Sequence, residues 1–331
     1  MIITVDCGTT NMRCRLYDDK TLLYEVKRKA GVRNTAFDGS ADFLRVSLKE
    51  CIEDILENNS LKESDIEIIL ASGTLASDVG IYRGTSHAIC PAGIDDSLRQ
   101  SRLVTMEDIT RIPIFFIPGV KTLPSPDETD EAKRIELADS MSGEECEIYG
   151  IIEALGIKED FIAVLPGSYL KSMEVSADGI IQTIRTGMCG EIIAAVSQHT
   201  ILKKSIPEPV IKEVVPEKLI FGYEYCKAHG VSPSLIKTRN AMLHLGMSQN
   251  DAANFFVGAI LYDDVRISAE LCRDGKLVVV GGSDPLKTVF TVLLEHVGIK
   301  NVVKLDDETA RRAPNLGAMC VYKRYLEQSG K

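Results

Sequence analysis

The stretch Asp6-Cys7-Gly8-Thr9-Thr10-Asn11-Met12-Arg13 carries more structural information than any other part of this sequence. Residues 2–5, which are mostly apolar, precede this stretch. Its last two residues begin a segment, 12–17, in which apolar and polar residues alternate. Two such segments joined by a polar turn are typical of a β-hairpin. Gly8 lets a ligand approach the turn closely, and Asp6 offers a carboxylate to a hard cation beside backbone N–H groups that suit phosphate oxygens. An ordinary polar hairpin turn is the alternative interpretation.

A weaker copy of this stretch occurs later in the chain. TVDCGTTNMRCRLYD, which starts at Thr4, aligns with AVLPGSYLKSMEVSA, which starts at Ala163. Three pairs of residues keep a separation of 159 positions, namely Gly8 and Gly167, Thr9 and Ser168, and Gly31 and Gly190. Chance similarity of two hairpins would also give such a match. A true repeat predicts two related halves, each opening with a hairpin whose turn faces a common ligand.

The length of 331 residues favours two domains with a ligand-binding cleft between them. Residues 123–139 are polar and acidic and begin with two prolines, so we place the boundary there, with domains at 1–140 and 141–331. Predicted strands alternate with segments of helical spacing, which makes the class α/β. The strands are expected at 2–5, 12–17, 22–26, 66–71, 114–117, 161–165, 276–280 and 301–305, and the longer helices at 41–58, 143–155, 217–229, 234–246, 248–271 and 316–328.

The net charge and the cysteine content indicate which partners and which cellular compartment to expect. A formal charge of −10, with no run of five basic residues, argues against nucleic acid as the main partner. The nine cysteines show no C-x-x-C spacing and are expected to be reduced and mostly buried. The N-terminus lacks the basic region of a signal peptide and no apolar run is long enough to span a membrane, so a cytoplasmic protein without a membrane partner is expected. A homodimer stays open.

Two further elements carry chemistry. The segment Val278-Val279-Val280-Gly281-Gly282-Ser283 reads as a buried strand that opens onto a glycine pair, against which the flat ring of adenosine could lie. No dinucleotide-binding glycine motif and no P-loop occurs. Glu144 and Glu145 stand at the expected start of a helix, where a carboxylate could accept the proton of a substrate hydroxyl. Two acidic residues that merely stabilise the helix N-terminus are the alternative.

Together the hairpin, the pair of glycine turns and the VVVGGS strand resemble the phosphate-1, phosphate-2 and adenosine elements of the sugar kinase/Hsp70/actin superfamily. An ordered set of shorter motifs resembles the 2-dehydro-3-deoxygalactonokinase family in particular and covers almost the whole chain. These are AGVRN at 30–34, IPGV at 117–120, SGEECEIYG at 142–150, LPGSYLK at 165–171, RTGMCGEI at 185–192, FFVGAIL at 255–261 and APNLGA at 313–318.

The resemblance implies two RNase H-like α/β domains with the nucleotide in the interdomain cleft. It also implies ATP-dependent phosphorylation of the terminal 6-hydroxyl of 2-dehydro-3-deoxy-D-galactonate in galactonate breakdown. By position, Asp6 would hold Mg²⁺ and Glu144 or Glu145 would be the catalytic base. The ATP-binding residues would be Gly8, Thr9, Thr10, Asn11, Gly167, Ser168, Gly281, Gly282 and Ser283. The candidates for binding the sugar acid are Arg13, Arg33, Asn34 and Lys171.

The chain also departs from the family's pattern beside the expected substrate pocket. It has Ser142 where the family usually has arginine before Gly-Glu-Glu, Ser168-Tyr169 in place of Thr-His, Lys171-Ser172 in place of Lys-Trp, and Ser72-Gly73-Thr74 in place of Gly-Met. A kinase of another aldonic or 2-keto sugar acid therefore remains an alternative. A catalytically silent nucleotide-binding module of the same fold is a further one, which the presence of Asp6 and the two glutamates disfavours.

Overall fold

The computed structural model describes residues 1–272 and 275–330 and divides into two compact units. Unit 1 comprises Met1–Lys158, Ser176–Ile184 and Arg311–Lys331, and unit 2 comprises Glu159–Val175 and Arg185–Ala310. Both units mix helices with a β-sheet, as the α/β prediction required. Residues 141–158 group with the N-terminal strands, whereas the division proposed from the sequence assigned them to the second domain.

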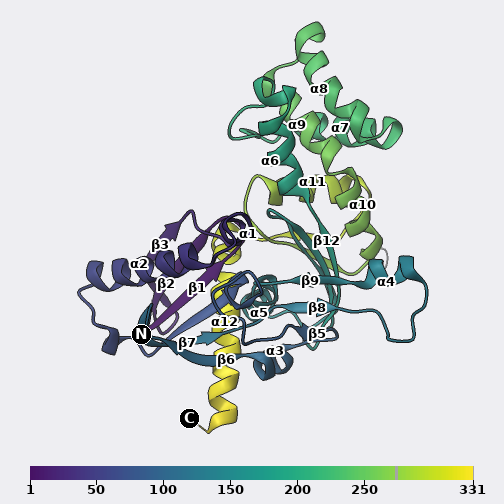
Figure 1. Cartoon of the computed structure of the whole chain (residues 1–331). Helices are drawn as coiled ribbons and strands as arrows, with labels where there is room; N and C mark the ends of the chain where they lie inside the picture. The colour runs from purple at the N-terminus through teal and green to yellow at the C-terminus, as the bar shows by residue number, and fades with distance from the viewer. Residues whose placement is uncertain (273–274, 331) are drawn as a thin grey trace. The chain divides into compact units, whose positions relative to one another are not determined.

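Unit 1 is built on a six-stranded sheet with the order β3-β2-β1-β4-β7-β6. The first three strands form an antiparallel meander, β4 and β7 run parallel to β1, and β6 is antiparallel. Their bounds are β1 Ile2–Cys7, β2 Met12–Asp18, β3 Thr21–Arg28, β4 Ile68–Gly73, β6 Arg102–Met106 and β7 Thr110–Phe116. Helix α2 (Asp42–Asn58) lies against this sheet (Figure 1) and buries Leu44, Leu48 and Ile52 there.

The remaining elements of unit 1 are a small sheet, several helices and 3₁₀ turns. The small sheet has the order β5-β8-β9, with bounds Ala88–Ile89, Val120–Thr122 and Asp139–Met141. The helices are α1 Val32–Asp38, α3 Ile94–Gln100, α4 Glu131–Leu137, α5 Glu144–Leu155 and α12 Asp307–Ser329, with 3₁₀ turns at Glu63–Asp65 and Thr74–Ala76. Helices α5 and α12 touch through Gly150, because a Cβ there would lie 1.8 Å from the carbonyl oxygen of Ala313.

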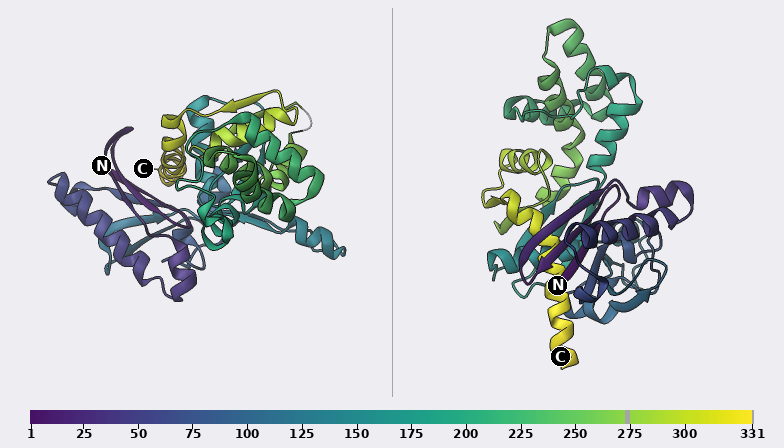
Figure 2. Two further views of the ribbon diagram at one scale, coloured as in Figure 1. Left: turned by 90° about the horizontal axis from the view of Figure 1, so that it is seen from above. Right: turned by 90° about the vertical axis from the view of Figure 1, so that its left-hand side faces the viewer.

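A five-stranded sheet with the order β12-β11-β10-β13-β14 belongs to unit 2, except for residues 181–184 of β12, which group with unit 1. The strands are β10 Phe161–Leu165, β11 Leu170–Val175, β12 Ile181–Gly187, β13 Leu277–Val280 and β14 Val302–Lys304. The helices are α6 Cys189–His199, α7 Pro216–His229, α8 Val231–Leu245, α9 Gln249–Ile260, α10 Tyr262–Leu271 and α11 Leu286–His296, with a 3₁₀ turn at Ile201–Lys204. Helices α7, α8 and α9 gather at one end of the unit (Figure 2), where Gly222 and Gly258 let α7 and α9 pack closely.

The two units share a topology that supports the repeat seen in the sequence. In each, an antiparallel hairpin comes first, β1–β2 and β10–β11, and a later strand pairs in parallel with its first strand, β4 with β1 and β13 with β10. The strand Phe161–Leu165 lies 159 positions after residues 2–6, which belong to β1. Each unit is therefore an RNase H-like α/β domain, as predicted.

The structure departs from the sequence prediction in a few elements. The helix expected over 248–271 is interrupted at Leu261, which separates α9 from α10. The polar connection at 123–139 contains the short helix α4, whose N-terminus is capped by the Asp130 side chain. All nine cysteines are free thiols and seven are buried, as predicted. Within residues 1–272 and 275–330 no helix has both the length and the apolar character needed to cross a membrane.

Candidate active site

The turn between β1 and β2, residues 8–11, is fixed by several backbone hydrogen bonds. The N–H of Gly8 donates to Asn11 O at 3.0 Å and closes the turn. The start of α1 fixes it from outside, because Val32 N–H donates to Gly8 O at 3.3 Å and Arg33 N–H donates to Thr9 O at 3.0 Å. No atom lies within 4 Å of the place a Cβ would take on Gly8, so the turn has open space at this position.

Asp6 stands at the end of β1, directly across the hairpin from Arg13. The Arg13 guanidinium donates to Asp6 Oδ2 at 3.2 Å, and the Asp6 side chain keeps 19% of its surface exposed. The other carboxylate oxygen, Oδ1, lies 3.9 Å from the place a Cβ would occupy on Gly143. The carboxylate is therefore partly exposed at the carboxyl end of β1 and adjoins the start of α5.

At the start of α5, the side chains of Glu144 and Glu145 lie in different environments. Gly143 has a φ of +114°, and both side-chain oxygens of Glu145 accept its N–H, at 3.0 and 2.8 Å. Glu145 is completely buried, and its burial, followed by the neighbouring charge of Glu144, raises its pKa from 4.5 to about 8. Glu145 is thus mainly protonated at neutral pH.

Glu144 stays at the surface of the same turn. Its side chain is half-buried, and Oε2 accepts the N–H of Ser142 at 3.1 Å. The Ser142 hydroxyl in turn contacts His87 Nε2 at 3.2 Å. Burial, and then the charge of Lys121, lowers the pKa of His87, so this imidazole is neutral at physiological pH. Of the two glutamates, only Glu144 has a side chain that is partly exposed.

Unit 2 fixes its own turn in a similar way. The start of α6 packs against residues 167–169, where Glu191 N–H donates to Ser168 O at 3.0 Å and the Cys189 thiol donates to Gly167 O at 3.5 Å. A Cβ on Gly190 would lie 2.3 Å from Gly167 O, so only glycine allows this approach. Burial raises the pKa of Cys189 to about 12, which keeps the thiol protonated and able to donate.

The predicted adenosine element adjoins this turn. Gly281 N–H donates to Val164 O at 3.0 Å, which extends the pairing of β13 with β10. Gly282 has a φ of +76°, and a Cβ there would lie 2.5 Å from Pro166 O. Ser283 follows and is exposed. The glycine pair and the turn at 167–169 are therefore neighbours within unit 2.

The four residues predicted to bind the sugar acid occupy different settings. Arg13 pairs with Asp6, and Arg33 is half-buried in the first turn of α1. The Asn34 side chain accepts the N–H of Gly31 at 3.2 Å and thereby caps α1. Lys171 lies in unit 2, is 7% exposed, and donates to Thr186 Oγ1 at 2.7 Å. The first three residues share unit 1, and Lys171 does not.

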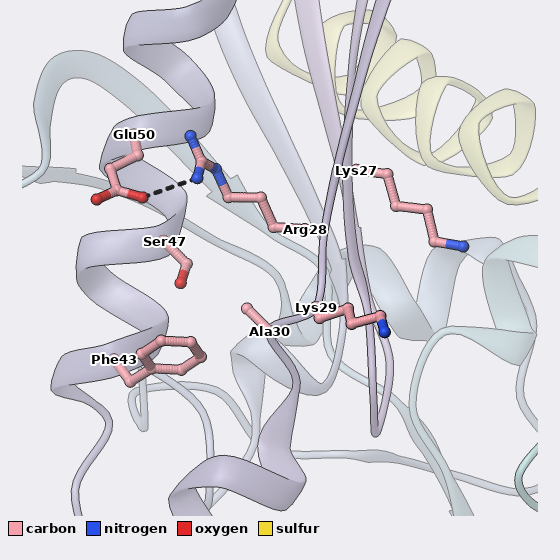
Figure 3. A pocket seen from close by; sticks show the side chains of 7 residues that line it. All are labelled: Lys27, Arg28, Lys29, Ala30, Phe43, Ser47 and Glu50. Carbon is pink, nitrogen blue, oxygen red and sulfur yellow. Dashed lines mark ion pairs between the residues drawn. The ribbon is translucent and has the colours of Figure 1, made fainter.

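None of these residues lines the pocket of about 360 Å³ in unit 1. Its lining is Lys27, Arg28, Lys29, Ala30, Phe43, Ser47 and Glu50 (Figure 3). Arg28 points toward Glu50 and is paired with both Glu50 and Asp54, whereas Lys27 and Lys29 point the other way. The three cations do not converge, so the pocket lacks the features of an anion site.

The side chain of Asp6 fits Mg²⁺, and the two turns fit the phosphates of ATP, which are the groups that the family resemblance implies. Asp6 Oδ1 offers one carboxylate oxygen, and no group of three or more His, Cys, Asp or Glu side chains suited to a metal exists among the described residues. That donor set fits Mg²⁺, which is commonly held by one or two carboxylates together with water and substrate phosphates. The open space at Gly8 and the two anchored turns fit the phosphates of a nucleotide.

Sequence reasoning missed Thr74, which supports the turn at 8–11, and Asp264, which contacts the end of β12. The Thr74 hydroxyl donates to Cys7 O at 2.9 Å and lies 3.4 Å from Gly8 O, so it supports the turn at 8–11 from the end of β4. Asp264 Oδ1 fills the space where a Cβ of Gly187 would be, 1.6 Å from that position. Burial, and then Asp263, raises the pKa of Asp264 to about 6. The repeated Gly31 and Gly190 were the sequence signal for the anchoring contacts.

Comparison with solved structures identifies the class of fold to which the protein belongs. A crystal structure of a candidate 2-dehydro-3-deoxygalactonokinase from Sinorhizobium meliloti matches with a TM-score of 0.74 at 20% identity, covering 98% of this chain and 96% of that one. The activator of 2-hydroxyisocaproyl-CoA dehydratase from Clostridium difficile, with bound ADPNP, matches with a TM-score of 0.51 at 10% identity, covering 100% and 97%. The fold is thus that of the actin-like ATPases and sugar kinases.

The family follows from the sequence itself. Residues 6–314 match the model of the 2-keto-3-deoxy-galactonokinase family, and the chain belongs to that family. No curated protein matches the sequence. The protein is therefore a kinase, a phosphotransferase with an alcohol group as acceptor, that uses a nucleotide to phosphorylate a keto-deoxy sugar acid.

Proposed function

We propose that the protein transfers the terminal phosphoryl group of Mg-ATP to the 6-hydroxyl of 2-dehydro-3-deoxy-D-galactonate. The observation that carries this proposal is the position of Asp6 beside the start of α5. Its Oδ1 approaches Gly143, and Glu144 is the next residue. The carboxylate that would bind the metal and the residue that would act as base are thus close together in unit 1, and this proximity supports phosphoryl transfer to a hydroxyl.

Asp6 would hold Mg²⁺, which neutralises charge on the transferred group when bound. The N–H groups of the turn at 8–11 would hold the phosphates near the metal, with Thr9, Thr10 and Asn11 adding side-chain donors. In unit 2, Gly167 and Ser168 would bind other phosphates and residues 281–283 the adenosine. The adjacency of Gly282 to Pro166 supports joint binding of one nucleotide by these two segments.

Glu144 would accept the proton of the 6-hydroxyl while the new oxygen–phosphorus bond forms. Its partial exposure supports that role, and the complete burial of Glu145 supports a positioning role for the second glutamate. Arg33 is our first choice for the carboxylate of the sugar acid. Its backbone N–H donates to Thr9 O at 3.0 Å, which places Arg33 beside the turn at 8–11, and its guanidinium can bind a carboxylate through two N–H groups. Asn34 and Lys171 remain candidates for the sugar hydroxyls.

We also propose that the enzyme works in the cytoplasm on free small molecules and not on nucleic acid. The nine free thiols support a reducing compartment, and the charge of −10 disfavours a polyanion. A homodimer remains a prediction. Departures such as Ser142, which donates its N–H to Glu144, support a second candidate, a kinase of another 2-keto or aldonic acid.

A titration calorimetry experiment tests the nucleotide part of this proposal. Wild-type protein should bind ADP in the presence of Mg²⁺ and much more weakly with EDTA, and Asp6→Asn should remove most of the metal dependence. Equal binding by the wild type with and without Mg²⁺ would overturn the assignment of Asp6.

A further inference from the structure

One steric feature recurs at the start of a helix in each unit. Gly31, the N-cap of α1, has a φ of −157°, which any residue can adopt. A Cβ on it would nevertheless lie 2.3 Å from Thr9 O and 2.5 Å from Thr10 N. Glycine is required here for space and not for backbone conformation, and the space is occupied by the turn at 8–11.

Gly190 meets the other turn in the same manner. Its φ is outside the left-handed region, and a Cβ on it would lie 2.3 Å from Gly167 O and 2.9 Å from Ser168 Cα. Gly31 and Gly190 also stand 159 positions apart, the separation that relates the two turns. The same contact, between a helix-start glycine and a hairpin turn, therefore occurs once in each half of the repeat.

The contact determines where the amides of the turns point. Carbonyl oxygens of Gly8 and Thr9 accept N–H groups from α1, and those of Gly167 and Ser168 accept donors from α6. The peptide bonds at both turns are trans. The C=O and N–H of a trans peptide point in opposite directions. The N–H groups of Thr9 and Thr10, and of Ser168 and Tyr169, are consequently directed away from the helix starts.

We propose that Gly31 and Gly190 are positioning residues for nucleotide binding: each lets a helix start hold the adjacent turn so that its amides face the phosphates. This inference rests on the proposed function, because it assumes that the two turns bind phosphate. A Cβ at either glycine pushes the helix start off the turn and releases the carbonyls, and the amides lose their fixed orientation. Nucleotide affinity falls as a result. A Cβ on Gly31 also displaces Arg33 and Asn34, the proposed sugar-acid residues of α1, whereas Gly190 lies in the other unit.

The test compares Gly31→Ala and Gly190→Ala with Gly222→Ala as the matched control. A Cβ on Gly222 would lie 2.0 Å from Phe255 O in the contact between α7 and α9, away from both turns. All three variants insert one methyl group against a backbone oxygen, and all should lower the melting temperature. The dissociation constant for Mg-ADP is measured by calorimetry, with the KM for the sugar acid as a second readout.

We expect a rise of at least about tenfold in the Mg-ADP dissociation constant for Gly31→Ala and for Gly190→Ala, and a change within about twofold for Gly222→Ala. The KM for the sugar acid should change by less than about threefold in Gly190→Ala and Gly222→Ala, which lie outside α1, the helix of Arg33 and Asn34. A dissociation constant within about twofold of wild type in both test variants would overturn the inference. A wild type that binds no Mg-ADP would instead overturn the proposed function as well, so the two failures are distinguishable.

Two gentler variants cover the case in which an alanine variant does not fold. Thr74→Val removes the hydroxyl that donates to Cys7 O, and Cys189→Ala removes the thiol that donates to Gly167 O. Neither inserts an atom beside a turn. Each should raise the Mg-ADP dissociation constant about threefold to tenfold, which matches the loss of one hydrogen bond. Unchanged affinity in both variants would contradict the anchoring role.

Discussion

Both side-chain oxygens of Glu145 accept the backbone N–H of Gly143, at 3.0 and 2.8 Å. The two residues are only two positions apart in the chain. The hydrogen bonds hold Gly143 at a φ of +114°, a backbone conformation that residues other than glycine rarely adopt. It also places a carboxyl group in a fully buried position directly after Glu144. The first turn of α5 is therefore organised by one glutamate and leaves the other half-buried.

The buried carboxyl predicts a specific pH dependence of stability. The pKa of Glu145 is about 8 in the folded protein and near 4.5 when unfolded, so the folded state holds a proton that the unfolded state loses between these values. Stability from this group is complete below about pH 4.5 and is lost as the pH rises through 8. Glu145→Gln should thus be stabilised relative to wild type by about 1 to 3 kcal/mol at pH 9 and little at pH 5. Urea unfolding at both pH values measures this, and a constant difference would contradict it.

Substitution of Glu144 and substitution of Glu145 should lower kcat to different extents. Glu144→Gln should keep the sugar-acid dissociation constant within a few-fold, while kcat falls by roughly 10² to 10⁴ because the proton acceptor is lost. Glu145→Gln is the matched control and should lower kcat less. If neither substitution lowers kcat more than about tenfold, the base assignment is wrong. Phosphoryl transfer through a loose transition state demands little from a base, so the remaining role of the glutamates would then be to position the substrate hydroxyl.

Asp6→Asn should fold normally and lower turnover at least about 10²-fold, because the metal loses its carboxylate and the transferred group is misplaced. The substitution keeps the size of the side chain, and Arg13 keeps an oxygen acceptor across the hairpin. Steady-state rates at limiting Mg²⁺, with circular dichroism as the folding control, check this. Near-normal activity at limiting Mg²⁺ would exclude Asp6 as the metal ligand.

Gly281→Val should raise the KM for ATP far more than the KM for the sugar acid. Gly281 is buried at the end of β13, and a branched side chain there would take the place of the adenine ring or of the neighbouring backbone. Initial-rate measurements with each substrate varied in turn give both constants. Equal increases in the two KM values would argue against an adenosine site at this strand end.

Most strands could be predicted from the sequence because their patterns are local. The runs at 2–5, 12–17 and 161–165 fall inside β1, β2 and β10, and the repeated turn chemistry led to the two-unit architecture. Helices α1 and α6 were not predicted. Helix α1 has seven residues, among them Asn34 and Thr35, and such a short segment depends on tertiary contacts such as those with the turn at 8–11.

The candidate site was predictable in residue type and not in geometry. Asp6, the two glutamates and the glycine turns could be found by motif. The difference between Glu144 and Glu145 could not, because it depends on the φ of Gly143 and on how α5 packs. The structure also gives Asn34, predicted to bind substrate, a capping contact with Gly31 that spacing alone did not suggest. Its role toward the sugar acid stays a prediction.

An ADP-release assay across a panel of sugar acids tests the phosphorylation of a 2-keto-3-deoxy sugar acid most directly. The panel should contain 2-dehydro-3-deoxy-D-galactonate, its gluconate epimer, galactonate, gluconate and unmodified hexoses, with Mg-ATP in excess. We predict that kcat/KM is highest for 2-dehydro-3-deoxy-D-galactonate and at least about 10²-fold lower for the hexoses, which lack the carboxylate. A higher kcat/KM for another acid, or ADP release that no member of the panel stimulates, would contradict the account.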